Sequence, residues 1–497
     1  MSKRTAISHI RTFNFRLIYK LLGSLLMWLS AAMILPCAVS LVCHDGSQFE
    51  LSISMLLMLA AGLFLHNIAG RGAAYELHEK ESFWLTSLMW LLIPLLGAMP
   101  FVLSGSVNNF VDALFESVSG FTTTGSSILT NLDEVPRGVI VWRSMTQWVG
   151  GLGLIMFIIA MQRRLHVGGT HLYGAEFSGT IQRKLNPHMT TSVSLMWRVY
   201  IAMTIGLLAI LLLTGNGFLN AFCITMSAVS SGGFLPSSAG LSDFSTLSLG
   251  VLTVFMLFSG INIALLYKLF TGHFADMWHD EELRLYLILF ICGASAIAVS
   301  MYSACITLPS AIGRACFHVA STISTCGLVL PADTSMPTWP LLAAIITLLF
   351  IVLGASAGST GGGLKLKRVM ILFRYVQNYL LSMVHPRAVA KVKIDGRVIS
   401  NEYINKVFAF VFLYMAFAAG GTLLLTDSGQ PLASSICLAL ANLSNLGPTP
   451  LIHIADPTFC YTALPTLSKC GLIVLMLAGR IEIFALIAIF SPAYWKR

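Results

Sequence analysis

The sequence predicts an all-α polytopic membrane protein: four pseudo-symmetric repeats, each a helix, a re-entrant loop and a second helix, around one central axis, with two extra N-terminal transmembrane helices. Three observations predict it: the composition, recurring long apolar runs, and four short segments with one shared pattern. The 497 residues are 56% hydrophobic and 10% charged, with a mean hydropathy of +0.81. Soluble globular proteins carry about 25% charged residues, so a bilayer is the expected environment.

Apolar runs of about 20 residues, the length that a helix needs to cross the hydrocarbon core, recur along the whole chain. The first follows a charged arm, has no small-residue cleavage site and is followed by another run, so we interpret it as a membrane anchor and not a removed signal peptide. The runs cover residues 17–42, 51–69, 83–103, 139–161, 195–214, 247–270, 283–308, 341–357, 364–384, 403–425 and 467–490.

The net charge of +9 is spread over the loops between these runs. Nucleic-acid binding would need a contiguous basic patch on a soluble domain, so we predict no nucleic-acid partner. The positive-inside rule explains the charges better and places the N- and C-termini in the cytosol. The predicted outer loops carry more acidic than basic residues, which either attracts cations to an outer mouth or only reflects the depletion of Lys and Arg from that side.

The chemistry-bearing residues give no sign of an enzyme. Ten cysteines are scattered singly without a CxxC pair, so buried thiols are the better interpretation. The sequence shows no ATP site, metal cage or catalytic cluster, and a membrane enzyme would need an intramembrane cluster of His, Asp or Glu. We therefore predict no enzymatic activity and no organic cofactor.

Four segments too short to cross the membrane lie between the long runs, and each ends in glycine. They read ALFESVSGFTTTG (residues 113–125), AFCITMSAVSSGG (221–233), ACFHVASTISTCG (315–327) and SICLALANLSNLG (435–447). Three residues before the final glycine every copy has a hydroxyl: Thr122, Ser230, Ser324 and Ser444. Self-similarity of this kind defines the architecture. It divides the chain into an N-terminal helix pair (1–75) and repeats over 76–165, 166–275, 276–390 and 391–497.

A ten-residue apolar stretch is typical of a re-entrant half-helix, whose irregular end must be buried in protein or line a water-filled space. Glycine lets the chain turn so that successive carbonyl oxygens point inward, and rings of such oxygens replace the hydration shell of a cation. The half-helices also direct their negative C-terminal ends at the ion. The alternative is that the small residues only permit close helix packing. Four copies in register favour a cation filter, with the four loops as pore loops around one central pore.

Several motifs together resemble the Trk/Ktr/HKT superfamily of potassium transporters, and within it the TrkH-type pore subunits with their two additional N-terminal helices. The resemblance covers nearly the whole chain. It rests on SGFTTTG (119–125), WRSMTQWVGGLG (142–153), SGGF (231–234), GASAGSTGGGLK (354–365), SNLGP (444–448) and AGRIEIF (478–484). It implies potassium uptake across the bacterial inner membrane, a homodimer, and gating by a separate cytosolic nucleotide-binding subunit of the TrkA type.

The resemblance also implies one filter glycine in each repeat. All four are present in this sequence, a pattern that in the superfamily accompanies potassium permeation, whereas serine at the first position accompanies sodium. We assign each glycine and the residue before it to a potassium filter: Thr124, Gly125, Gly232, Gly233, Cys326, Gly327, Leu446 and Gly447.

The glycine-rich run over residues 354–363 interrupts the second helix of the third repeat, because each glycine costs about 1 kcal/mol in a helix relative to alanine. We interpret it as a flexible intramembrane loop under the filter that obstructs ions until it moves, a gating role that the resemblance also implies. The alternative is a GxxxG packing face built on Gly354 and Gly358. The residues assigned to the gate are Gly358, Ser359, Thr360, Gly361, Gly362 and Gly363.

Arg480 lies within the last long run, where an arginine is costly unless it faces the protein interior with a partner. We expect it to donate hydrogen bonds to carbonyls of the 354–363 loop or to place a positive barrier in the pore, and we assign it to the gate. The alternative is that it reaches the inner surface of the membrane, with Glu482 on another face of the helix.

A selective pore of this kind needs no bond-breaking chemistry, since the membrane potential supplies about 2.3 kcal/mol per unit charge per 100 mV. The alternative is a secondary cation symporter with alternating access, which would require inverted repeats, whereas these four run parallel. The basic loops over residues 163–184 and 365–397 are candidate docking surfaces for the regulatory subunit, although positive-inside bias explains them equally well.

Overall fold

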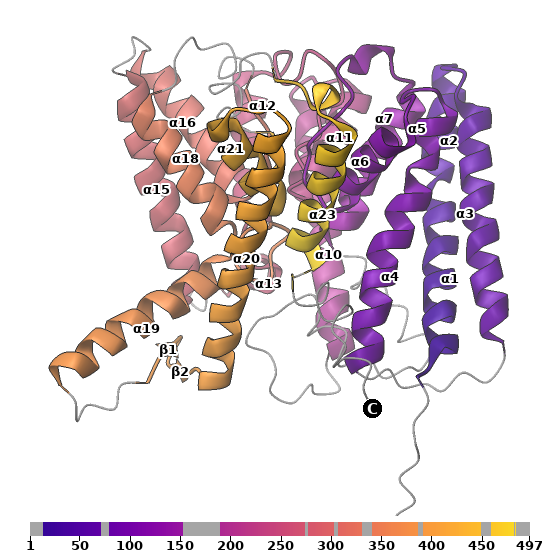
Figure 1. Cartoon of the computed structure of the whole chain (residues 1–497). Coiled ribbons are helices and arrows are strands. Elements are labelled where there is room, and N and C mark those ends of the chain that lie inside the picture. The colour runs from indigo at the N-terminus through magenta and orange to yellow at the C-terminus, as the bar shows by residue number, and fades with distance from the viewer. Residues whose placement is uncertain are drawn as a thin grey trace, which may run out of the picture.

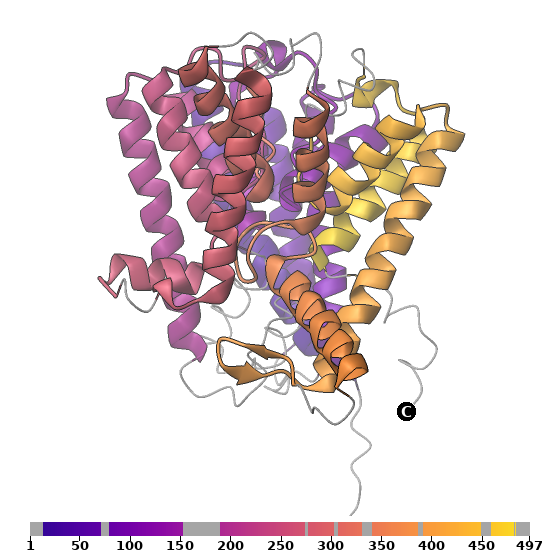
Figure 2. The ribbon, with the colours of Figure 1, turned by 90° about the vertical axis from the view of Figure 1, so that its left-hand side faces the viewer.

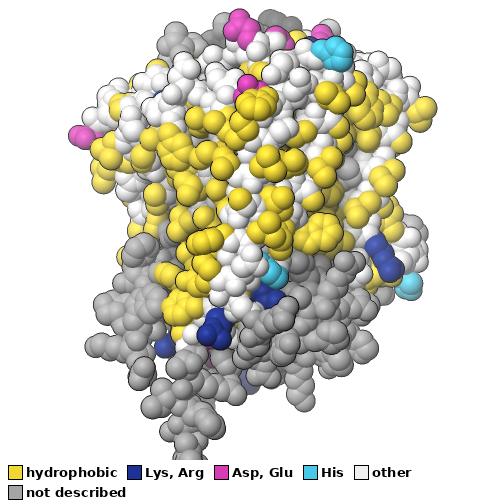
Figure 3. Space-filling view, turned by 90° about the vertical axis from the view of Figure 1, so that its right-hand side faces the viewer, with side chains coloured by type: hydrophobic (Ala, Val, Ile, Leu, Met, Phe, Trp, Pro, Cys, Tyr) yellow, Lys and Arg dark blue, Asp and Glu magenta, His cyan; other side chains and the backbone are white. Residues whose placement is uncertain are grey.

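The computed structural model describes residues 13–70, 79–152, 189–273, 277–302, 307–330, 340–385, 391–448, 459–481 and 483. Within these ranges, six helices are long and apolar enough to cross a membrane, or seven if one bent pair is taken as a single span. They run roughly side by side through the molecule (Figure 1). On the face shown in Figure 3, apolar side chains form a broad band, with acidic groups near one end and Lys and Arg near the other. This distribution agrees with the positive-inside rule.

The N-terminal helix pair consists of α1 (Phe15–Ala32), its continuation α2 (Ile34–Cys43) and α3 (Gln48–Ala69). Helices α1 and α3 pack unusually closely where Gly23 faces Gly62. A Cβ on Gly23 would lie 2.6 Å from the Gly62 carbonyl oxygen and 2.7 Å from the backbone nitrogen of His66. Two small residues therefore allow the backbones to touch, which is the usual basis of close helix association in membranes.

Each repeat then contributes a long helix, a short helix and a second helix. The first has α4 (Glu79–Gly97) with α5 (Met99–Leu103), then α6 (Phe110–Phe121), the short η1 (Leu132–Glu134) and α7 (Arg137–Gly151). The second has α10 (Met189–Leu213), α11 (Phe218–Val229) and α12 (Thr246–Ser259) with α13 (Ile263–Phe270). The third has α15 (Glu281–Tyr302), α16 (Leu308–Ile323), α18 (Leu341–Leu353) and α19 (Leu366–Val384). The fourth has α20 (Asn401–Asp427), α21 (Leu432–Leu443), η2 (Tyr461–Ala463) and α23 (Thr466–Ile481).

The repeats close into a ring around the short helices. The second helix of each repeat packs against the short helix of the next: α7 against α11, α12 against α16, α18 against α21, and α23 back against α6. Each short helix also contacts the long helix of its own repeat. The four short helices α6, α11, α16 and α21 thus lie at the centre, enclosed by the longer ones. The predicted all-α fold with four repeats and an additional N-terminal pair is confirmed.

Three of the predicted runs differ from the structure. The run over 247–270 is not one straight span, because α12 and α13 meet at 117°. The helix in the run over 341–357 ends at Leu353, because Gly354 has a left-handed φ of +68°. The run over 364–384 forms α19, which is not apolar enough to count among the spans. It leans away from the bundle beside the two-stranded hairpin of β1 (Lys393–Ile394) and β2 (Arg397–Val398) (Figures 1 and 2).

Other predictions fall partly or wholly outside the described residues. These are the far ends of the runs over 139–161, 283–308 and 467–490, the loop over 163–184, Glu482 and both chain termini.

Asp45, in the loop between α2 and α3, attaches the N-terminal pair to the first repeat. Its Oδ2 accepts a hydrogen bond from the backbone nitrogen of Gly138, in the first turn of α7, at 2.8 Å. Its Oδ1 accepts from the backbone nitrogen and the hydroxyl of Ser47, each at 3.0 Å, and from the Ser40 hydroxyl. Burial alone would raise the pKa of Asp45, but these donors outweigh it and lower the pKa below its ordinary value of 3.8. The carboxylate therefore acts as a remote N-cap of α7.

Replacing this cap should weaken the joint in a pH-dependent way. We expect Asp45→Ala, which removes both acceptor oxygens, to lower the free energy of unfolding by about 1 kcal/mol at neutral pH, the usual cost of losing an N-cap. Because folding lowers the pKa of Asp45, its contribution is complete above about pH 4 and is lost as the pH falls through the folded pKa. Thermal unfolding of both proteins in detergent from pH 7 to pH 3 tests this. A melting-temperature gap that persists unchanged to pH 3 would contradict it.

Candidate functional site

The four short helices end in the same way, directly before the predicted filter glycines. In each, the residue before the glycine donates its N–H to the carbonyl five positions earlier: Thr124 to Ser119, Gly232 to Ser227, Cys326 to Ser321 and Leu446 to Ala441, at 2.8–2.9 Å. A second bond joins the preceding residue to the carbonyl three positions earlier, as from Thr123 to Gly120 at 2.9 Å. This pair of bonds is the Schellman motif, which satisfies the free carbonyls of a helix end.

The Schellman turns need a left-handed residue two positions before each filter glycine. The residues there are Thr123, Ser231, Thr325 and Asn445, with φ between +52° and +57°. Glycine or asparagine is the usual choice, and the left-handed region costs other L-residues about 1–2 kcal/mol each. A β-branched threonine with positive φ is a true outlier. The surrounding structure therefore holds these turns against a local preference, and such strain is often found at functional sites.

The filter glycines themselves form a closed ring of contacts between repeats. A Cβ on Gly125 would overlap the carbonyl oxygen of Gly232, and one on Gly233 would overlap that of Cys326. In the same way, Gly327 lies against the carbonyl of Leu446, and Gly447 against that of Thr124, which closes the circle. All four glycines have left-handed φ, from +73° to +84°. The structure thus brings together the eight residues that the sequence assigned to the filter, each glycine facing the residue before the next glycine.

Polar side chains tie this ring together from outside. The Gln147 amide on α7 donates to the Gly232 carbonyl at 2.7 Å. The Asn445 amide donates to Thr124 Oγ1 at 3.0 Å and to the Met476 carbonyl on α23 at 2.9 Å. Ser126, just after the first glycine, donates to Asn442 Oδ1 at 2.9 Å. Non-helical backbone at this depth is tolerated only with such partners.

The predicted gating loop lies against the inner ends of the third and fourth short helices. Gly361 packs on the carbonyl of Ser324 and Gly362 on that of Ser444, so closely that a Cβ on either would collide with its neighbour. The backbone nitrogen of Gly362 donates to Thr325 Oγ1 at 2.7 Å. The loop is therefore bonded directly to the left-handed turn of the third repeat.

The loop is also fixed to the bend between α12 and α13. Ser356 donates its N–H to the Gly260 carbonyl at 3.0 Å, and the Gly358 carbonyl accepts from the Ile263 N–H at 3.1 Å. From α15, the buried Glu282 carboxylate accepts the N–H of Ala357 at 2.6 Å. The backbone at the bend in the second repeat thus supplies hydrogen-bonding partners for the loop that interrupts the third.

Arg480 reaches this loop from the end of α23. It donates through Nη1 to the Thr360 carbonyl at 2.8 Å, and through Nη2 to the carbonyls of Gly150 at 2.6 Å and Gly151 at 3.0 Å. The expected contact with the loop is therefore present, together with an unexpected one to the end of α7. One guanidinium joins three repeats, while its gating role stays a prediction.

Sequence reasoning missed several residues of the site. Thr325 and Asn445 had a detectable signal, because every copy has a polar residue two positions before the glycine. Glu116 and Arg143 were not assigned to any site: their side chains are 0% and 2% exposed and form an ion pair. Asp112 and Lys469 are paired as well, at 2.7 Å. A charge inside an apolar segment was the signal for all four.

Known proteins resemble this chain over almost its entire length. The family model TrkH, described as a cation transport protein, matches residues 47–497. The Trk system potassium uptake protein TrkH of Escherichia coli strain K12 is 32% identical over 494 residues, covering 97% of this chain and 100% of that protein. The protein of the same name from Halomonas elongata is 30% identical over 497 residues, with the same coverage. The crystal structure of the potassium transporter TrkH from Vibrio parahaemolyticus superposes with a TM-score of 0.85 at 27% identity, covering 97% and 100%.

The bond between the loop and the third turn is testable through Thr325. Thr325→Val keeps the side-chain shape but leaves the buried N–H of Gly362 without its acceptor, which costs about 1–3 kcal/mol. We expect a lower melting temperature in detergent. Thr322→Val is the matched control, because within the described part of the chain the Thr322 hydroxyl bonds the His318 carbonyl of its own helix and not the loop. Equal melting temperatures for the two variants would contradict the assignment.

Proposed function

Because the chain belongs to the TrkH family of cation transport proteins, we propose that it takes up potassium ions across the bacterial inner membrane through the pore at the centre of its four repeats. Membership in this family of transporters also bears out the prediction that the chain is not an enzyme. The carrying observation is the closed ring of Gly125, Gly233, Gly327 and Gly447, each in contact with the next repeat through a backbone carbonyl.

A ring of this kind suits a dehydrated cation better than any other ligand. Glycines with left-handed φ let the backbone supply oxygen atoms without side chains in the way, and carbonyl oxygens are the ligands that replace the water of a potassium ion. The short helices contribute the negative ends of their dipoles from four sides. Potassium is thus the transported substrate, and the inward membrane potential drives it.

The loop over residues 354–363 and Arg480 form the gate in this proposal. The loop lies against the ends of two short helices next to the filter, where an ordered backbone would obstruct ions. Its contacts with Glu282, the α12–α13 bend and Arg480 hold it in place. Opening would need these bonds to exchange partners, so the gate is an element with two discrete arrangements and not a loose flap.

A secondary cation symporter with alternating access is the second candidate. The observation that favours it is the pair of helices broken inside the membrane region, at 260–262 and at 354–365, since broken helices are typical of such transporters. The parallel arrangement of the four repeats favours the pore. Dependence of potassium uptake on a sodium or proton gradient, measured in liposomes, separates the two.

The proposed assembly is a homodimer that a cytosolic, nucleotide-binding subunit of the TrkA type regulates. The position of α19 and the β1–β2 hairpin supports the regulatory contact, because they lie together at one end of the molecule, beneath the loop over residues 354–363 (Figure 2). Arg374 of α19 already pairs with Glu281 at the start of α15, at 2.9 Å. Glu282, the next residue of α15, accepts the hydrogen bond from Ala357 of the loop. A protein that binds α19 would therefore act close to the residue that holds the loop in place.

The first test is potassium uptake in cells that lack their own uptake systems. We expect the wild-type chain to restore growth at low potassium, and Gly125→Ser to lower the ratio of potassium to sodium uptake by about tenfold, because a side chain there displaces the Gly232 carbonyl. Gly250→Ser in α12, where a side chain meets open space, is the control. Failure of the wild-type chain to transport potassium, or an unchanged ratio in Gly125→Ser, would refute the filter.

The gate is tested by Arg480→Ala, which removes three hydrogen bonds to backbone carbonyls. We expect uptake to rise by about tenfold without loss of protein from the membrane, since one charge-assisted hydrogen bond is worth about 1.5 kcal/mol or more. Arg480→Lys keeps the charge but not the planar guanidinium, so its uptake should lie between that of the wild type and that of Arg480→Ala. Uptake kinetics identical to wild type would rule out a gating role.

A further inference from the structure

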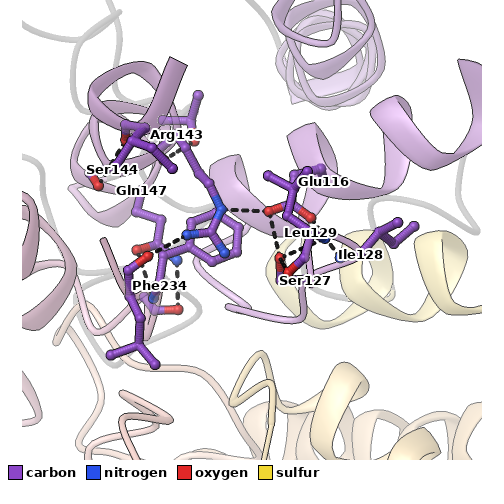
Figure 4. A network of polar contacts seen from close by, with 12 residues as sticks. Glu116, Ser127, Ile128, Leu129, Arg143, Ser144, Gln147 and Phe234 are labelled. Carbon is purple, nitrogen blue, oxygen red and sulfur yellow. Dashed lines mark hydrogen bonds and ion pairs between the residues drawn. The ribbon is translucent and has the colours of Figure 1, made fainter. Parts of the chain in front are cut away.

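A buried ion pair joins α6 to α7 beside residues that follow the first two glycines of the ring (Figure 4). Glu116 on α6 and Arg143 on α7 are joined through Oε1 and Nε at 2.5 Å, with side chains that are 0% and 2% exposed. Two buried charges are stable only when their remaining hydrogen-bonding groups are also satisfied. The identity of those partners indicates what the pair does.

Glu116 holds the chain that follows the first filter glycine. Its Oε1 accepts a hydrogen bond from the Ser127 hydroxyl at 2.9 Å, and its Oε2 accepts from the backbone nitrogen of Ile128 at 2.9 Å. Both residues lie within three positions of Gly125. The carboxylate thus fixes this outgoing strand to its own short helix.

Arg143 holds the chain that follows the second filter glycine. Its Nη1 donates to the Leu235 carbonyl at 2.8 Å, and its guanidinium lies 3.5 Å from the centre of the buried Phe234 ring. One helical turn further along α7, Gln147 accepts from the Phe234 N–H at 3.2 Å while donating to Gly232. Through the ion pair, these contacts join the outgoing strands of repeats 1 and 2.

The support differs between repeats, although the backbone ring is nearly symmetric. Nine residues before the filter glycine stand Glu116, Ile224, His318 and Leu438. The His318 imidazole contacts the Thr347 hydroxyl of α18 at 2.8 Å, and the strand after Gly327 is bonded by the neutral Ser321 hydroxyl, which donates to the Leu328 carbonyl at 2.7 Å. Among the described residues, a charged pair supports the strands of the first two repeats alone.

We propose that Glu116 and Arg143 are positioning residues that set the ion selectivity of the filter. A smaller ion such as sodium needs its oxygen ligands closer together, so a filter discriminates against it only if its backbone resists closing in. The ion pair holds two adjacent strands at a fixed spacing and supplies that resistance. This inference rests on the proposed function and adds to it the residues that determine specificity.

The experiment compares uptake of potassium and sodium by the full-length protein in liposomes, under an inward potential. We expect Glu116→Gln and Arg143→Lys to lower the ratio of potassium to sodium uptake by about tenfold, which corresponds to about 1.4 kcal/mol. Asp112→Asn is the matched control, because the Asp112–Lys469 pair has no contact with the strands after the first two filter glycines. A purely structural role would reduce the uptake of both ions alike.

Each result has one meaning. If the wild-type protein does not transport potassium, the proposed function fails; if it does and the variants keep the wild-type ratio, the selectivity role of the pair is overturned. If a single substitution prevents the protein from accumulating in the membrane, two other variants test the selectivity role. Ser127→Ala removes one half-buried partner of Glu116, and Glu116→Gln/Arg143→Gln leaves no unpaired charge. A lowered ratio in these supports the role, and an unchanged ratio in both refutes it.

Discussion

The structure depends on one constraint: backbone that is not helical must find hydrogen-bonding partners where water is scarce. Five stretches of this protein face that constraint: the four strands after the short helices and the loop over 354–365. Schellman bonds satisfy the helix ends, and single side chains from neighbouring elements satisfy the rest, such as Gln147 at Gly232 and Thr325 at Gly362. The enclosing helices therefore shield the centre from lipid, and they also supply the polar groups that bond its non-helical backbone.

The ring can close because glycine, which has no side chain, stands at the four positions where neighbouring repeats meet. At each glycine of the ring, a carbonyl of the next repeat occupies the space that a Cβ would need, so any larger residue at these four positions would push the segments apart. This backbone symmetry coexists with unlike supports for the strands after the glycines: an ion pair for the first two repeats and a neutral hydroxyl for the third. The proposed filter is built from one chain and can thus be stiffer on one side than on the other, which a ring of identical subunits could not be.

The breaks in the second and third repeats are hydrogen-bonded to each other. The bend at 260–262 offers backbone groups that the loop at 354–363 needs, and Arg480 joins that loop to the end of α7. In the proposed gate, movement of the loop would therefore be coupled to the second helices of the first, second and fourth repeats. Coupling through a network with alternative hydrogen-bonding partners is the physical requirement for a switch that a distant partner can control.

The sequence alone determined the architecture, because spans of about 20 apolar residues and a repeated glycine pattern leave few alternatives in a bilayer. It also identified the ring residues and Arg480, since glycine and intramembrane charge are costly without a purpose. Only the tertiary structure decided that Glu116 pairs with Arg143, that α12 meets α13 at a sharp angle, and that Thr325 bonds to Gly362 and Asn445 to Thr124. Such contacts join residues far apart in the chain. Local pattern carries no information about which buried polar groups meet, because the packing of all four repeats sets those distances.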